Sequence, residues 1–159
     1  MFGTPVIPLY EEEVRRGARQ LIVDGTSYPM AGVLDLVVEH GKRPDGHGYV
    51  EAEVDRSNPY FALGTRLRGH EFHYSRVTGG EDSTATTLRL RRGRGVGGAR
   101  DGVVRGRIWA SYTHLHALGT PSWGTSFAAA AAAYRRERAG DGNGNGFGQG
   151  GQGIAATGA

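Results

Sequence analysis

Cysteine is absent from the 159-residue sequence. Its absence excludes disulfides, a thiolate metal site and a cysteine nucleophile supplied by the chain itself. Lysine is nearly absent too, because Lys42 is the only one and the other basic residues are arginines. The formal net charge of +3 is too small to indicate nucleic-acid binding by itself.

Long apolar runs are also missing. No stretch approaches the ~18 apolar residues of a membrane-spanning helix. Residues Met1–Tyr10 lack the basic start and the long apolar core of a signal peptide. We therefore expect a cytoplasmic protein whose partners include neither nucleic acid nor a membrane.

Glycine, by contrast, is abundant, with 28 residues, and it dominates the C-terminal end. The stretch from Ala139 onward has few side chains to bury and maximal backbone entropy. We predict a disordered Gly-rich tail over residues 139–159, so that the folded part ends near Arg138.

The order of hydrophobic patterns predicts an α/β protein that is rich in strands and has a C-terminal helix. Acids come before bases in Glu11–Gln20, which favours a short helix, and the alanine-rich stretch Trp123–Arg138 favours a longer one. The expected strands are Leu21–Val23, Tyr49–Val54, Arg66–Val77, Thr84–Leu90 and Val103–Trp109. Residues Met30–Val38 could form either a strand or an irregular buried segment.

Two histidines, His114 and His116, follow the last of these strands in the sequence A-S-Y-T-H-L-H-A. They share a face only if the strand continues through both. If the strand ends near His114 in an open α/β sheet, the imidazole lies where such sheets place their sites, and it could act as the base that activates a nucleophile. The alternative is a pair of edge-strand histidines without a catalytic task.

A second polar block, G-H-E-F-H-Y-S, begins at Gly69. Strand alternation places His70 and Phe72 on one face and Glu71 and His73 on the other. A metal site needs three or four converging ligands, and the separation of His70 from His73 disfavours one. The remaining alternatives are a ligand-facing role for His70 or Glu71 and an exposed polar ribbon.

The glycine-arginine stretch 91–102 resembles a phosphate-binding loop only loosely. No helix is expected to begin after it, so the helix-terminus mechanism of phosphate binding is absent. Its arginines could still bind an anion, but a solvated loop is the preferred interpretation.

Three blocks together resemble one protein family. They are Y-P-M-A-G-V-L from Tyr28, L-R-G-H-E-F-H-Y-S from Leu67 and A-S-Y-T-H-L-H-A from Ala110. Their order and spacing are similar to those of the carboxyl-terminal part of cobyrinic acid a,c-diamide synthase, a glutamine-dependent enzyme that amidates carboxylates of a tetrapyrrole. The stretch that begins at His114 also resembles the branch of this family that is thought to amidate sirohaem.

The resemblance covers about residues 21–138 and leaves 1–20 as a divergent N-terminal segment. It implies an incomplete class I glutamine amidotransferase-like sheet of the flavodoxin-like type. In the family, a cysteine on a nucleophile elbow attacks glutamine, and a histidine from a later strand activates that cysteine. His114 matches this histidine, and His116 is the second choice. The block with His70, Glu71 and His73 is expected to shape the substrate site.

The same resemblance implies an ATP-binding domain that uses ATP and magnesium to activate the acceptor carboxylate. The elbow cysteine and that domain are both missing from this sequence. We therefore expect no cofactor on this chain and no activity from the chain alone. A partner would have to supply an N-terminal half with the cysteine and the ATP site, and the substrates would be glutamine and a tetrapyrrole carboxylate.

Three explanations for the missing parts remain: a fragment, which is preferred, one half of a split enzyme, or a degenerate domain. The last would be a non-catalytic binding or assembly module.

Overall fold

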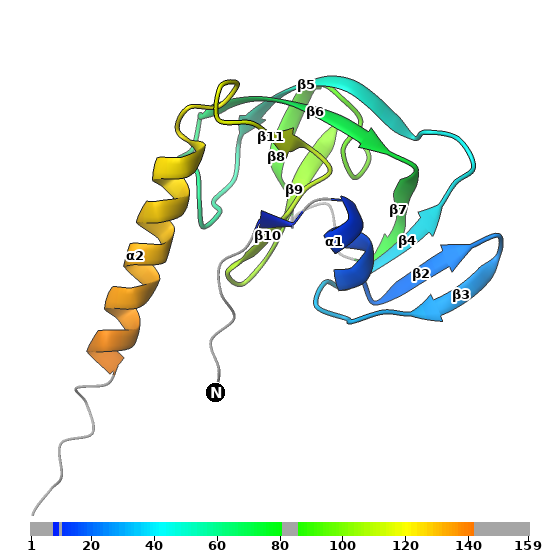
Figure 1. The fold of residues 1–159 in the computed structure, drawn as a ribbon, viewed down its shortest axis with the longest axis horizontal. Helices are drawn as coiled ribbons and strands as arrows, with labels where there is room; N and C mark the ends of the chain where they lie inside the picture. The colour runs from blue at the N-terminus through cyan, green and yellow to red at the C-terminus, as the bar shows by residue number, and fades with distance from the viewer. Residues whose placement is uncertain (1–7, 10, 81–85, 142–159) are drawn as a thin grey trace, which may run out of the picture.

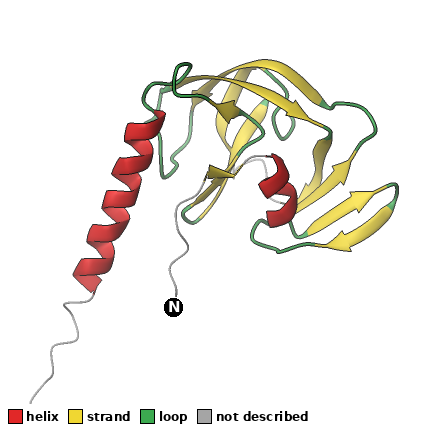
Figure 2. Ribbon diagram, in the orientation of Figure 1, coloured by secondary structure: helices red, strands yellow, loops and turns green. Residues whose placement is uncertain are grey.

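Within the described residues, which are 8–9, 11–80 and 86–141, the chain forms two sheets and two helices (Figures 1 and 2). This computed structural model places seven strands in one sheet, in the order β1-β10-β9-β8-β5-β6-β11, and four in the other, in the order β3-β2-β4-β7. The strands are β1 (Pro8–Leu9), β2 (Gln20–Val23), β3 (Thr26–Pro29), β4 (Leu36–His40), β5 (Gly46–Val54), β6 (Arg66–His73), β7 (Ser75–Gly80), β8 (Thr86–Arg92), β9 (Arg100–Arg105), β10 (Ile108–Ala110) and β11 (His114–Leu115). The helices are α1 (Glu11–Gly17) and α2 (Trp123–Asp141). The strand-rich α/β class with a C-terminal helix is therefore confirmed.

Most neighbouring strands in the two sheets run antiparallel. In the described part of the chain, the parallel pairs are β1 with β10 and β2 with β4. The histidine segment lies between two antiparallel pairs: β10 is antiparallel to β9, and β11 is antiparallel to β6. His114 therefore begins a strand, and the strand before it already ends at Ala110. The two-residue connection between β9 and β10 requires an antiparallel pair, since a parallel pair needs a longer crossover.

The larger sheet curls so that its two ends approach each other. Strand β10 ends at Ala110 and β11 begins at His114, although the two strands stand near opposite ends of the strand order. Four backbone steps span at most about 14 Å, so the sheet must bend around to bring β11 beside β6. The histidine segment thus closes the curl.

The predicted single strand Val103–Trp109 is wrong, because a tight turn divides it into β9 and β10. Arg105 lies opposite Ile108, which leaves Gly106 and Arg107 as a two-residue hairpin loop. Gly106 has φ of 59°, a conformation that glycine adopts easily and that two-residue hairpins require. The predicted strand Arg66–Val77 is also divided, since β6 ends at His73 and β7 continues in the other sheet.

Two apolar clusters fill the interior. One lies inside the curled sheet, where β5 contributes the alternate residues Val50, Ala52 and Val54, and Trp109 packs against them. The buried and exposed positions of β5 alternate over these residues, as the sequence pattern predicts. The other cluster joins α1, through Val14, to the smaller sheet and to the end of β10; its buried members are Val14, Ala18, Leu34, Leu36, Val38, Val103, Ala110 and Tyr112.

Helix α2 extends away from both sheets (Figure 1). Near its start the Phe127 ring stacks on Tyr60. Farther along, Arg107 of the β9–β10 turn pairs with Glu137 and lies 4.7 Å from the centre of the Tyr134 ring. The helix predicted for residues 123–138 is confirmed, and it continues to Asp141. The first three residues of the predicted disordered tail are therefore helical, and residues 142–159 lie outside the described residues. No helix in the described part of the chain is both long enough and apolar enough to cross a membrane.

Candidate active site

His114 lies at the first position of β11, directly opposite His70 of β6. The two imidazole rings are 5.0 Å apart between centroids and tilted by 39°. His114 is half-buried, whereas His70 is exposed. The strand ends at Leu115. The pairing of β11 with β6 thus brings together two imidazoles from two separate sequence blocks.

His116 lies just beyond this strand and is exposed. Its Nδ1 atom accepts a hydrogen bond from the backbone N–H of Leu118 at 3.2 Å. In the neutral ring, an accepting Nδ1 leaves the proton on Nε2. His116 therefore presents a donor rather than an acceptor at its free nitrogen.

The G-H-E-F-H-Y-S block alternates as predicted. His70 and Phe72 are exposed, and Glu71 and His73 are buried, with exposed fractions of 4% and 0%. The expected separation of His70 from His73 is therefore confirmed. Among the described residues, no group of three or more histidines and acids is arranged to hold a metal ion.

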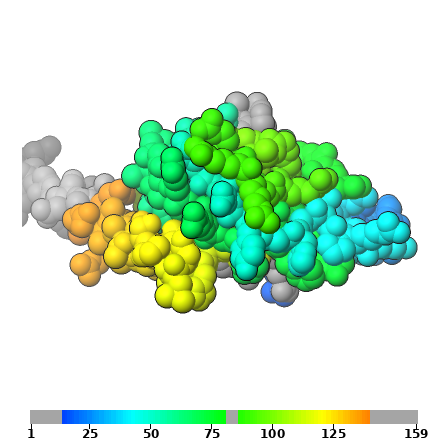
Figure 3. Space-filling model, turned by 90° about the horizontal axis from the view of Figure 1, so that it is seen from above, coloured from blue at the N-terminus to red at the C-terminus, as the bar shows by residue number. Residues whose placement is uncertain are grey.

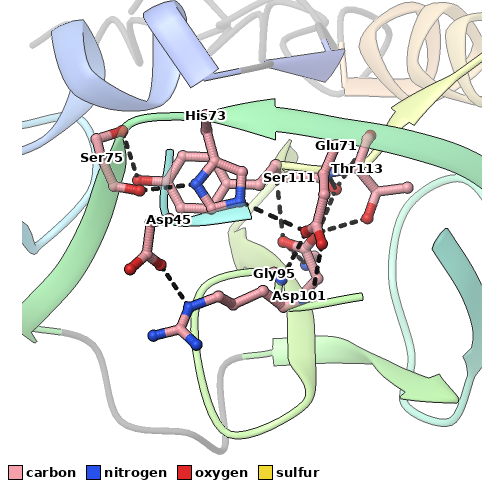
Figure 4. A network of polar contacts seen from close by, with 11 residues as sticks. Asp45, Glu71, His73, Ser75, Gly95, Asp101, Ser111 and Thr113 are labelled. Atoms are coloured by element: carbon pink, nitrogen blue, oxygen red, sulfur yellow. Dashed lines mark hydrogen bonds and ion pairs between the residues drawn. The ribbon is translucent and has the colours of Figure 1, made fainter. Parts of the chain in front are cut away.

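Glu71 of β6 holds the glycine-arginine loop in place (Figure 4). Its two carboxylate oxygens accept the backbone N–H groups of Arg94 at 2.7 Å and of Gly95 at 2.9 Å. These bonds satisfy a buried charge with fixed backbone donors, which is how proteins tolerate buried carboxylates. Glu71 therefore holds the loop that follows β8 in place beside the groove described below.

His73 is fully buried and stacks on Tyr112, with centroids 4.1 Å apart and planes 9° from parallel. Its Nδ1 lies 2.7 Å from the carbonyl oxygen of Ser75. Because a carbonyl can only accept, Nδ1 carries a proton, and Nε2 faces Glu71 Oε2 at 3.4 Å. His73 thus ties the β6–β7 corner to the segment that leads into His114, and the shaping role expected for it stays a prediction.

Asp101 holds the segment between β10 and β11. It is completely buried and accepts hydrogen bonds from side chains and backbone of that segment (Figure 4). The donors are Ser111 Oγ (3.0 Å), Tyr112 N (3.2 Å), Thr113 N (2.9 Å), Thr113 Oγ1 (2.7 Å) and the neighbouring Gly102 N (2.9 Å). Burial raises the pKa of the Asp101 carboxyl, and these hydrogen bonds oppose the increase.

Sequence reasoning missed Asp101. The residue stands in the stretch A-R-D-G-V, where an acid before a glycine is typical of a turn. The signal that could have revealed it is the run Ser111-Tyr112-Thr113, which provides several donors just before His114 and needs a buried acceptor.

The arginines of the glycine-arginine stretch are mostly paired with carboxylates. Arg91 binds Glu53 at 2.9 Å, Arg94 binds Asp45 at 2.6 Å, and Arg100 binds Asp55 at 2.5 Å. The hydrogen bond from Arg100 lowers the pKa of the Asp55 carboxyl. The pairs favour a solvated loop over a phosphate-binding loop.

A groove of about 680 Å³ runs over the outer face of β5 and β6. Figure 3 looks down on this side of the molecule. His70 and His116 both line the groove, together with aromatic side chains of β5 and β6. Of the sequence-predicted site residues, His70, His116 and Glu71 therefore line this surface, whereas His73 is fully buried.

Gly69 permits the close approach of β11 to β6. A Cβ atom at this position would lie 2.3 Å from the carbonyl oxygen of His114, and that contact is with backbone. We expect Gly69→Ala to lower the free energy of unfolding by roughly 2–3 kcal/mol, as overpacking does. Urea denaturation measures this, and the imidazole NMR signals of His114 report its displacement.

Gly79→Ala is the matched control for Gly69→Ala. Gly79 is also a strand glycine, and a Cβ there would meet Val37 side-chain atoms at an ordinary 3.7 Å. We expect a change below about 0.5 kcal/mol. Equal stabilities for the two variants would contradict the close contact between β6 and β11.

Comparison with known proteins matches residues 17–122 to the model of the CobB/CobQ-like glutamine amidotransferase domain. A cobyrinate a,c-diamide synthase from Magnetococcus marinus is 32% identical over 111 residues, which are 70% of this chain and 24% of that protein. The corresponding enzyme from Methanothermobacter thermautotrophicus is 40% identical over 98 residues, 62% of this chain and 22% of that protein. A hydrogenobyrinate a,c-diamide synthase from Rhodobacter capsulatus is 38% identical over 101 residues, 64% of this chain and 23% of that protein.

Proposed function

Because the chain belongs to the family of CobB/CobQ-like glutamine amidotransferase domains, we propose that it is part of a glutamine-dependent enzyme that amidates tetrapyrrole carboxylates. The observation that carries this proposal is the His114 segment, which the Asp101 hydrogen bonds and the β6 pairing hold in a defined place. The matched relatives are named for cobyrinate or hydrogenobyrinate. Their names favour a corrin precursor over sirohaem as the acceptor.

The chain spans about a quarter of the length of the relatives it matches. The steps that need ATP and magnesium therefore belong, on this proposal, to a region that this sequence does not contain. The thiol must also come from elsewhere, because the sequence has no cysteine. The chain's own contribution is the imidazole and the surface around it.

His114 would act on that thiol as a base. A thiol with a pKa of about 8.5 is only a few per cent ionised at neutral pH, and an adjacent imidazole increases that fraction. The imidazole takes the thiol proton, and the thiolate attacks the carboxamide carbon of glutamine. The proton then passes to the departing nitrogen, which leaves as ammonia, and water hydrolyses the thioester to glutamate.

The edge of β10 is the expected place for the thiol-bearing strand. Nucleophile elbows are turns from a strand into a helix. Here β1 lies parallel to β10, with Leu9 opposite Ala110, and α1 begins at Glu11. Because β1 has only two residues, a partner strand could replace it at an edge that leads directly into the histidine segment.

A reconstitution experiment tests the proposal. The chain is mixed with a separately expressed N-terminal portion of the Magnetococcus marinus relative that carries that family's cysteine and ATP site. We expect glutamine-dependent release of ammonia and glutamate only when both polypeptides are present. The full-length relative is the positive control, and release no greater than the sum of the separate polypeptides would contradict the proposal.

The absence of cysteine also supports a second candidate, a non-catalytic binding or assembly module. This candidate predicts that the chain binds the same N-terminal portion without any release of ammonia. Size-exclusion chromatography of the mixture, combined with the ammonia assay, separates the two.

A further inference from the structure

The groove on the outer face of β5 and β6 is built from aligned cross-strand pairs. In the antiparallel register, Tyr49 lies opposite His70, and His47 lies opposite Phe72. Directly opposed residues point to the same face of a sheet. These four rings, with His116 from the segment after β11, therefore line one continuous surface of the 680 Å³ groove.

The aromatic side chains of this groove are unusually exposed. Tyr49 is 73% exposed and Phe72 is 48% exposed. The His47 and Phe72 rings meet edge to face with centroids 5.4 Å apart, which braces Phe72. Exposed apolar surface that is gathered in one place marks a binding site more often than scattered apolar residues do. A flat, unsaturated ring system suits such a surface, because it can stack on side-chain rings.

Positive charge lies beside the same surface. Arg68 lines the groove and is exposed, and no carboxylate among the described residues forms an ion pair with it. The carboxylate nearest in register is Glu51, which lies opposite Arg68 on the neighbouring strand. The Arg92 guanidinium lies 5.9 Å from the centre of the Tyr49 ring, and Glu51 lies opposite Arg92 as well as Arg68. Glu71 also lines the groove, but its two carboxylate oxygens accept N–H groups of the loop backbone. The groove therefore offers cationic groups to an anionic ligand.

We infer that this groove binds a planar, conjugated ring system that carries carboxylate groups. The rings of Tyr49 and Phe72 contact the ligand face, and Arg68 binds a carboxylate. The further identification of this ligand with the tetrapyrrole acceptor rests on the proposed function. Because His70 lines the groove and also contacts His114, a ligand held here lies next to the proposed site of ammonia release.

Coproporphyrin III, a fluorescent tetrapyrrole with four carboxylates, is the probe. Titration with the whole chain should give saturable binding, and Arg68→Gln should weaken it about tenfold, as expected for the loss of a charge-assisted hydrogen bond. Tyr49→Ala should weaken binding about fivefold or more through lost stacking. The tetramethyl ester of the probe, which has no charge, should bind the wild-type chain at least tenfold more weakly.

Matched controls exist on other surfaces. Arg43 is an exposed loop arginine, and Tyr28 is 48% exposed on β3 of the smaller sheet. Arg43→Gln and Tyr28→Ala should change the affinity less than twofold. If the groove variants bind as tightly as the wild-type chain, or if the ester binds as well as the acid, the inference is overturned.

The outcome is independent of the reconstitution assay. Binding that depends on Arg68 without ammonia release in the mixture supports the groove and contradicts the proposed function. Ammonia release without such binding supports the proposed function and contradicts the inference about the groove. Ligand affinity and glutamine hydrolysis are therefore measured separately on the same wild-type preparation.

Discussion

Replacing His114 with alanine should lower the glutamine-dependent ammonia release of the reconstituted mixture by about 100-fold or more, because a positioned general base contributes roughly that factor. The imidazole lies at the start of β11 and is held opposite His70. Without it, the incoming thiol keeps its proton at neutral pH, and the attack on glutamine slows. Initial rates of glutamate formation measure the loss.

His116 is the comparison that gives this prediction its specificity. Its Nδ1 accepts the Leu118 N–H, so in the neutral ring the free nitrogen carries the proton and cannot take another. We therefore expect His116→Ala to retain at least about a third of the rate. Equal losses in the two variants would contradict the assignment of His114, and a larger loss in His116→Ala would reverse it.

Folding must be checked in both variants. His114 is half-buried against His70, so its loss removes a ring contact as well as a base. His114→Gln keeps a polar side chain of similar size and should be as inactive as His114→Ala. If the glutamine variant were active, the effect of the alanine variant would be structural.

Several elements of the fold could be predicted from local sequence. The alternation of β5 and the separation of His70 from Glu71 and His73 follow from a period of two residues. Helix α2 follows from the helix propensity of its alanines. Pattern alone could not predict which strands pair. The two-residue turn at Gly106 and Arg107, which divides Val103–Trp109 into two strands, was not predicted because apolar residues stand on both sides of it.

The candidate site could be predicted only in part. The imidazoles of His70 and His114 were identified as candidates, but their contact depends on pairing between residues 44 positions apart. The role of Asp101 could not be predicted from the sequence, because it depends on burial and on donors from another segment. Long-range pairing and buried hydrogen bonds are set by the packed fold, and local sequence carries little trace of either.

Asp101→Ala should have the largest effect on stability. The aspartate is completely buried and accepts hydrogen bonds from Ser111, Tyr112, Thr113 and Gly102. Alanine would leave those donors buried without an acceptor. A buried donor left without an acceptor costs about 1–3 kcal/mol, so the loss of several acceptor bonds removes a large fraction of the total stability of a small domain. Urea denaturation followed by circular dichroism measures the change.

Two further variants keep the prediction testable even if Asp101→Ala does not fold. Ser111→Ala removes one donor and should cost only about 1 kcal/mol. The control Asp35→Ala removes an aspartate of which 60% of the side chain is exposed and which pairs with Arg19. It should cost less than about 1 kcal/mol. A folded Asp101→Ala variant as stable as Asp35→Ala would contradict the role of Asp101 as the central acceptor.

The same carboxylate couples stability to the site, because its partners lie directly before His114. Asp101→Asn keeps one accepting oxygen but turns an amide donor toward other donors, so part of the network is lost. We expect this variant to fold with lower stability and to release ammonia in the mixture more slowly, since Thr113 no longer holds the start of β11. A variant with reduced stability and an unchanged rate would show that the position of His114 is set by β6 alone.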